Sequence, residues 1–240
     1  MKNKNIGVCA ICGLTKKLTF EHYPPKAAFN ENPVLIKDHR HINPAEAHLY
    51  GKSMRSNRGM GGYKLCATCN NNTGTWYAKE YIDVVTKSSP IIANAHDSQR
   101  VQFSIQLKPL NFLKQVLTFH LCADKATGIV RKYVSENNFI LDKSAKDLSE
   151  KIKIYMYATN SVTHRFMGIS TVFTGDINNI GSYSEFNFHP FGFLLALDSP
   201  PPEQLMKDIT YFKEFDFNQN ENIEFSLPIL STNRGMIGTY

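Results

Sequence analysis

The sequence predicts an α+β protein in which a small metal-stabilised N-terminal unit precedes a mixed α+β domain rich in antiparallel strands. Three observations lead to this fold class. Two Cys-x-x-Cys pairs frame the first part of the chain. A stretch with helical periodicity follows the second pair, and short runs with strand periodicity fill the C-terminal part. We expect two domains, residues 1–93 and residues 94–240.

The two cysteine pairs are Cys9 with Cys12 (CAIC) and Cys66 with Cys69 (CATC), and 53 residues separate them. A tight Cys-x-x-Cys turn supplies two thiolates, so two such turns predict one closed, structural zinc site. Four unrelated buried cysteines are the alternative. The fifth cysteine, Cys122, stands in an apolar run, and we expect it to be a small buried side chain.

The N-terminus has no apolar run of the length that a secretory signal needs, and no stretch of 18 apolar residues occurs in the chain. We therefore expect a cytoplasmic protein with no membrane contact. In that compartment paired cysteines bind metal more often than they form disulfides, which supports the zinc site.

The positive charge is concentrated in the first part of the chain. Residues 1–93 carry 13 Lys and Arg against 6 Asp and Glu, whereas residues 94–240 carry 14 against 15. A local basic excess favours a polyanion such as nucleic acid as the partner, because neutralised phosphates release counterions. A basic face that is merely solvated is the alternative.

A helix is expected from about Thr73, directly after the second cysteine pair. Its apolar side chains recur at helical spacing and should pack on a small core. We expect Ser88, Ser89 and Pro90 to end it. The residues on the apolar face are Trp76, Tyr77, Tyr81, Val84 and Val85, and we expect the first two in the core rather than stacked on bases.

The region from residue 94 begins with a strand at residues 102–107 and a helix at residues 109–123, which has proline near its start. Strand-like runs then follow, separated by turn residues. The expected strands are KIKIYMYAT (151–159), RFMGISTVFT (165–174), SEFNFH (184–189), FGFLLALD (191–198) and NIEFSLPIL (222–230).

The segment TFEHYPPKAAF lies between the two cysteine pairs. The segment CNNNTG begins with Cys69, the last cysteine of the second pair. The order C-x-x-C, then Glu-His-x-x-Pro-Lys, then C-x-x-C-Asn resembles the HNH superfamily of nucleases over roughly residues 8–87. The resemblance implies a treble-clef-like ββα-metal active site braced by a four-cysteine zinc. It is closest to members in which an acidic residue precedes the catalytic histidine and an asparagine follows the last cysteine.

Carried over by position, the resemblance makes His22 the general base and makes Glu21 and Asn70 ligands of one catalytic Mg²⁺ or Mn²⁺ ion. The chemistry is consistent, because phosphodiester hydrolysis needs a deprotonated water and positive charge where negative charge accumulates. Asn71 and Asn72 compete with Asn70 for the ligand role, and the family pattern alone favours Asn70.

Two features make this motif unusual. Glu21 stands where Asp is frequent, and a long insertion, roughly residues 30–63, precedes the second cysteine pair. Adjacent residues on a strand point to opposite sides, so Glu21 and His22 cannot share a cleft in a flat ladder. We expect an irregular turn at residues 23–25 to resolve this conflict.

Four cations are expected to contact DNA: Lys26, Arg55, Arg58 and Lys64. Plain solvation of Lys26, and a mobile loop for the other three, are the alternatives. His39 and His41 could also bind a metal ion. Solvated loop histidines are the stronger interpretation in so polar a setting, and His48 is expected on a surface helix.

The resemblance implies a metal-dependent HNH endonuclease that hydrolyses DNA. Family analogy suggests an effector of a bacterial anti-phage defence or restriction-type system. The competing reading is a non-catalytic zinc module that binds nucleic acid or a protein partner. For residues 94–240 we expect a role in specificity, in binding a protein partner or in self-association.

Overall fold

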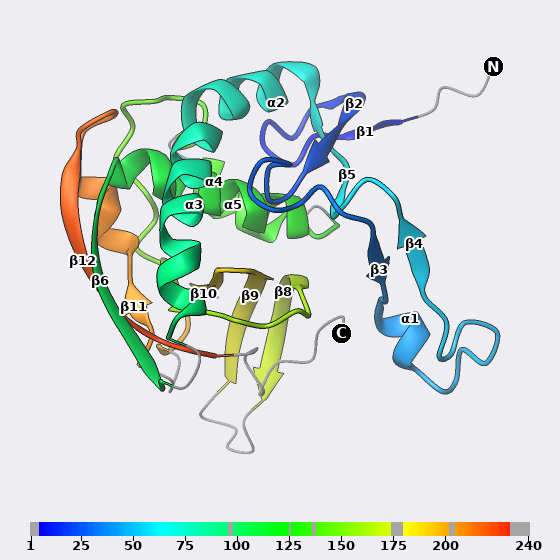
Figure 1. Ribbon diagram of the computed structural model, residues 1–240. Helices are drawn as coiled ribbons and strands as arrows, with labels where there is room; N and C mark the ends of the chain where they lie inside the picture. The colour runs from blue at the N-terminus through cyan, green and yellow to red at the C-terminus, as the bar shows by residue number, and fades with distance from the viewer. Residues whose placement is uncertain are drawn as a thin grey trace.

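The computed structural model describes residues 5–95, 98–124, 126–135, 138–173, 180–201 and 205–230. It is a mixed α+β protein, and every pairing between its named strands is antiparallel. In Figure 1, helices α3 and α4 lie between the N-terminal strands at the top and the largest sheet at the bottom. The expected α+β class with antiparallel strands is confirmed at this level.

Three strands build the N-terminal sheet, in the order β1 (Ile6–Val8), β2 (Thr15–His22) and β5 (Gly61–Cys66). The β2–β5 ladder shifts register between Thr19 and Phe20. Such an irregularity bends a strand and re-aims its side chains. The chain leaves β5 directly into a helix, because Cys66 is both the last strand residue and the N-cap.

The helix after the cysteines is longer than expected. It consists of α2 (Ala67–Thr73), the π-helical turn η1 (Gly74–Ala78) and α3 (Lys79–Ala93). The expected end at Ser88 to Pro90 is wrong, since Pro90 lies inside α3. Proline removes one helical hydrogen bond, whereas continuation of the helix buries Ile92 completely. Burial of that last turn outweighs the helix-ending tendency of Ser88, Ser89 and Pro90.

The insertion forms a projection that extends to the right in Figure 1. It contains β3 (Val34–Ile36), α1 (His39–Ile42) and β4 (Met54–Ser56), and β3 pairs only with β4. The expectation of a solvated His41 is wrong. Its side chain is buried, and its Nδ1 contacts Asp38 in a capping box at the start of α1. His48 is exposed as expected, but it lies in a turn, not in a helix.

The C-terminal part pairs β6 (Arg100–Leu107) with β12 (Glu221–Pro228), and α4 (Pro109–Ala123) follows β6 in the chain and packs against α3. The expected helix at residues 109–123 is confirmed at both ends, and Pro109 opens it. The expected strands are all present, although Thr174 lies outside the described residues. The remaining elements are α5 (Ile129–Ser135), β7 (Ile152–Ala158), β8 (Arg165–Phe173), β9 (Ile180–Phe188), β10 (Phe191–Leu197), β11 (Lys207–Asp208) and η2 (Thr210–Glu214).

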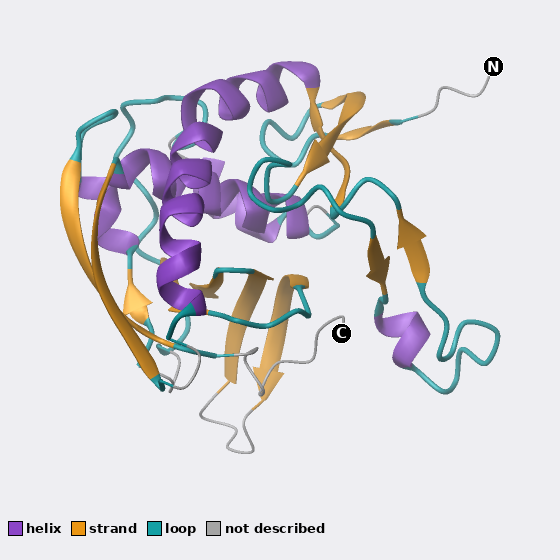
Figure 2. Ribbon diagram, viewed as in Figure 1, coloured by secondary structure: helices purple, strands orange, loops and turns teal. Residues whose placement is uncertain are grey.

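A five-stranded sheet, in the order β11-β7-β10-β9-β8, closes the lower face of the helices. Figure 2 shows α4 and α5 between this sheet and the N-terminal strands, with α3 running beside them. One cluster of buried apolar side chains extends through the protein and includes Cys9 in the N-terminal part and Leu227 in β12. Tyr81 of α3 packs on Phe112 and Phe119 of α4, with ring centroids 5.8 and 4.9 Å apart. The division at residues 93 and 94 stays a prediction.

Tyr77 and Cys122 are buried, as expected, and Trp76 packs partly buried against the core. Within the described part of the chain, no helix combines the length and the apolar character that a bilayer crossing requires.

Candidate metal centre and active site

The four paired cysteines come together at one point. Cys9 and Cys12 lie in the turn between β1 and β2, Cys66 ends β5, and Cys69 lies in the first turn of α2. All four sulfur atoms lie within 4.8 Å of one another. In a tetrahedral zinc site with Zn–S bonds of about 2.3 Å, sulfur atoms lie about 3.8 Å apart. The cluster could hold a zinc ion.

The environment of the sulfurs also suits a cation. The thiol of Cys69 and backbone amides, including that of Cys66, hydrogen-bond to Cys9 and lower the pKa of Cys9 to about 4. Burial raises the pKa of Cys12, and the hydrogen bond with Cys9 raises that of Cys69. Four thiolates this close repel one another, so a bound cation is what would allow all four to ionise.

Glu21 and Asn70 meet beside the cluster, although 48 residues separate them in the chain. Burial raises the pKa of Glu21 to about 7, and a hydrogen bond with the Asn70 side chain opposes this rise. The Asn70 amide also donates to Thr19 Oγ1 at 3.0 Å. Thr19 Oγ1 in turn donates to the carbonyl of Leu65 at 3.0 Å. This chain of hydrogen bonds fixes the amide next to the carboxylate.

His22 follows Glu21 at the end of β2. Its ring packs edge-on against Phe20, with centroids 5.0 Å apart. Burial is the main cause that lowers the pKa of His22, the charges of Arg58 and Lys26 lower it further, and a hydrogen bond to the Arg58 carbonyl opposes the change. Burial and the two nearby cations therefore favour the neutral imidazole. Because one ring nitrogen donates to that carbonyl, the other nitrogen of the neutral ring is an acceptor.

The structure brings Glu21 and Asn70 together, whereas the side chain of His22 lies on the other side of β2. Alternation along β2 puts Glu21 on the side of Thr19 and Asn70, and His22 on the side of Phe20. Strand β2 ends at His22, and the chain bends at Tyr23, which is joined to Pro24 by a cis peptide bond. A bend is present where the irregular turn was expected, but it follows His22 and leaves Glu21 and His22 on opposite sides of β2, so it does not resolve the conflict.

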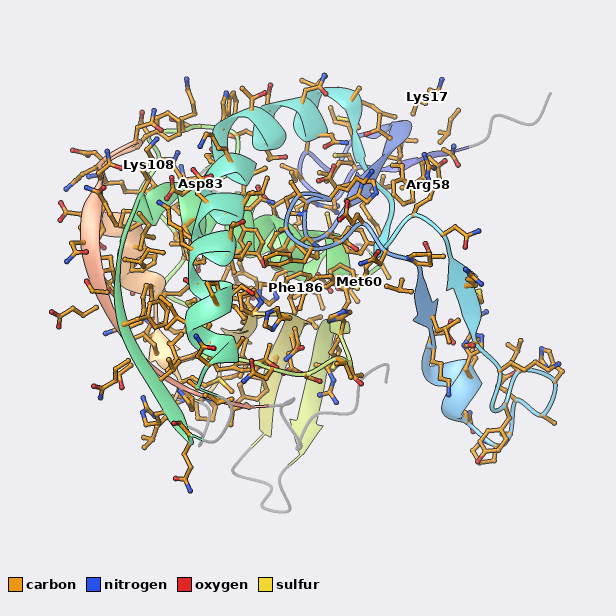
Figure 3. All side chains as sticks on the ribbon, viewed as in Figure 1. Lys17, Arg58, Met60, Asp83, Lys108 and Phe186 are labelled. Carbon is orange, nitrogen blue, oxygen red and sulfur yellow. The ribbon has the colours of Figure 1, made fainter. Side chains whose placement is uncertain are left out.

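The four expected DNA-contacting cations lie in three places. Lys26 and Arg58 lie close enough to His22 to act on its pKa. The guanidinium of Arg58 lies 4.6 Å from the centre of the Phe20 ring, on the N-terminal strands at the right of Figure 3. Lys64 lies on β5 opposite the register shift. Arg55 lies on β4 of the projection and donates to Asn57 Oδ1 at 2.9 Å.

Sequence reasoning missed Asn30, which closes the base of the projection. Its buried amide donates to the carbonyls of Pro24 and Met60, both at 2.7 Å, and its Oδ1 accepts from the Met60 amide at 2.6 Å. The two ends of the projection are held together next to Arg58, whose carbonyl contacts His22. Nothing in the sequence separates Asn30 from the other asparagines of this polar stretch.

Gly59 is part of the same closure. Its φ is +72°, and a Cβ atom there would lie 2.4 Å from the Asn30 carbonyl oxygen. Only glycine fits both the backbone conformation and the space. The glycine-rich character of this stretch was therefore a signal for a close approach of two backbone segments.

Comparisons of the chain with protein-family models, with curated proteins and with solved structures found no match.

Proposed function

We propose that the protein is a metal-dependent DNA endonuclease of the HNH type. Two antiparallel strands, β2 and β5, lead into helix α2, and the cysteine cluster braces their ends. This strand-strand-helix order is what the ββα-metal resemblance requires. The observation that carries the proposal is the contact between Glu21 and Asn70 beside that cluster, because it joins two residues which the motif assigns to one ion.

In this proposal His22 is the general base. A base must be unprotonated at the working pH and must present a free lone pair to the attacking water. Burial lowers the pKa of His22, and the Arg58 carbonyl takes its N–H. The other ring nitrogen can then accept a proton from a water molecule.

The carboxylate of Glu21 and the amide oxygen of Asn70 would hold the catalytic ion, and hard oxygen donors are what Mg²⁺ and Mn²⁺ prefer. Such an ion would supply positive charge to the phosphate and to the departing oxygen. Lys26 and Arg58, on the His22 side, would attract the DNA backbone, since cations that neutralise phosphates supply most of the sequence-independent affinity.

The proposed biological setting is a bacterial anti-phage or restriction-type system, by analogy with small two-part nucleases. In that setting residues 94–240 would select the target, bind a protein partner or mediate self-association.

Plasmid cleavage tests the proposal. Purified protein should nick or linearise supercoiled DNA with Mg²⁺ or Mn²⁺, and His22→Ala should abolish cutting, with a rate loss of at least about 100-fold. His48→Ala is the matched control, because His48 is an exposed histidine on the projection, and it should cut at the unchanged rate. Circular dichroism should confirm that both variants are folded.

The same assay distinguishes the nuclease from the alternative function, a non-catalytic zinc module. If wild-type protein binds DNA and zinc but cuts no substrate with either ion, the protein is a non-catalytic zinc module. Equal cleavage by wild type and His22→Ala would remove His22 from the mechanism.

A further inference from the structure

A groove of about 560 Å³ lies between the base of the projection and the beginning of β8. That volume is within the range of small-molecule and cofactor sites. One wall includes Tyr23, Phe29 and Met60, and the other includes His164 and Phe166. In the view of Figure 3, Met60 lies between the N-terminal strands and β8.

His164 contributes an aromatic ring to the wall of the groove. Its ring stacks on Phe188, with centroids 3.9 Å apart and planes 16° from parallel. Its Nδ1 is buried and has no hydrogen-bond partner among the described residues. A buried polar atom without a partner is costly.

The charge of the groove favours a neutral ligand over a phosphate. Among the described residues that line it, Lys37 and Asp38 are oppositely charged, and Asp38 is paired with Arg40 at 2.6 Å. The remaining side chains are aromatic, aliphatic or amide-bearing, apart from the hydroxyl of Thr163. Aromatic walls with few polar groups are the chemistry that receives an unstacked nucleobase.

The groove also adjoins the backbone at His22, whose side chain is not among the residues that line it. Gly61, which lines it, is the cross-strand partner of His22, and Tyr23, which lines it too, is the next residue in the chain. A strand whose phosphate lies at His22 would therefore bring a neighbouring base to the mouth of the groove.

We propose that this groove binds one nucleobase of the DNA strand, next to the phosphate at His22. The inference rests on the proposed nuclease function and makes its substrate more specific. A base can enter the groove only when it leaves the stack, so the favoured substrate is single-stranded DNA or a duplex in which a base near the cut is unpaired or flipped out.

The test measures binding without cleavage. Full-length, zinc-loaded His22→Ala protein is titrated, with no added Mg²⁺ or Mn²⁺, into a fluorescently labelled thymidine octamer and into an octamer with the same backbone and no bases. The abasic octamer should bind about tenfold more weakly, which is the size of one base stacked on an aromatic side chain.

A second substitution assigns that difference to the groove. His164→Ala in the His22→Ala background should weaken binding of the thymidine octamer about tenfold and leave binding of the abasic octamer unchanged. His48→Ala is the matched control and should change neither. If His164→Ala does not fold, Phe29→Ala, which removes an exposed aromatic wall of the groove, serves in its place.

The outcomes separate this inference from the proposed function. Plasmid cleavage together with binding that is indifferent to His164 and Phe29 would overturn the base site and leave the nuclease intact. Base-dependent binding that requires His164, in a protein that cuts no DNA, would support the groove and overturn the nuclease. Failure of both octamers to bind would overturn the base site.

Discussion

At the scale of single residues, His120 shows how burial determines the protonation state of a polar side chain. It lies completely buried in α4. Ser184 donates its hydroxyl proton to the Met167 carbonyl at 2.8 Å, so its oxygen is left to accept from His120 Nδ1 at 2.8 Å. Burial lowers the pKa of His120 to about 3.

This burial predicts a loss of stability in acid. The unfolded chain binds a proton at His120 below pH 6.5, whereas the folded chain binds it only near pH 3. The stabilising contribution is therefore complete above pH 6.5 and is lost as the pH falls through that window, at up to about 1.4 kcal/mol per pH unit. His120→Gln should flatten the dependence of the free energy of unfolding on pH between 4 and 6.5.

Urea denaturation at several pH values measures this slope. His48→Gln changes an exposed histidine and should leave the slope as it is in the wild type. An unchanged slope in His120→Gln would mean that other groups govern acid unfolding.

Asn30 gives a second prediction at this scale. Asn30→Ala removes all three side-chain hydrogen bonds at the base of the projection and leaves buried backbone groups without partners. We expect a loss of about 2–4 kcal/mol in the free energy of unfolding, measured by urea denaturation. Asn32→Ala, at an exposed neighbouring asparagine, should cost less than about 0.5 kcal/mol. Equal losses in the two variants would contradict the role given to Asn30.

At the scale of elements, the cysteine cluster joins the turn between β1 and β2 to the start of α2. None of these pieces is long, and β1 has only three residues. Metal binding is therefore expected to contribute directly to the folding of this sheet. The same contact sets the position of Asn70, since it follows Cys69 in the first turns of α2.

Substitution of one cysteine tests this dependence. Wild-type protein should contain about one zinc per chain, and Cys66→Ser should lose zinc and destabilise the N-terminal strands. Metal analysis and amide hydrogen exchange of β1, β2 and β5 measure these effects. Cys122→Ser, which changes a buried cysteine outside the cluster, should keep its zinc. A zinc-free wild-type protein that is fully folded would refute the structural role.

At the scale of the whole molecule, α3 and α4 connect the N-terminal strands to the lower sheet. Phe119 of α4 contacts Tyr81 of α3 and also stacks on Phe186 of β9, at a centroid distance of 4.5 Å. A single side chain therefore bridges parts of the chain that the sequence assigns to different domains.

This shared packing predicts one cooperative unfolding transition, even if the two parts have different roles. Phe119→Ala should cost about 3–5 kcal/mol and should lower the stability of the zinc-binding part together with that of the lower sheet. Hydrogen exchange of β5 and β9 in the variant measures both. Loss of protection in β9 alone would instead support two independent domains at the division of residues 93 and 94.

Local patterns in the sequence determined several features of this protein. Apolar spacing and the opening proline gave both ends of α4, and alternation gave the C-terminal strands. The Cys-x-x-Cys spacing predicted the sulfur cluster. These features depend on neighbours within a turn or a strand, so the sequence encodes them directly.

Only the tertiary structure decided the rest. Pro90 continues a helix because Ile92 is buried against distant residues, and His41 is buried although most of its sequence neighbours are polar. The order of the five-stranded sheet, the closure at Asn30 and the groove beside His164 also join segments far apart in the chain. Contacts of this kind add packing and hydrogen-bond energies that no local propensity contains.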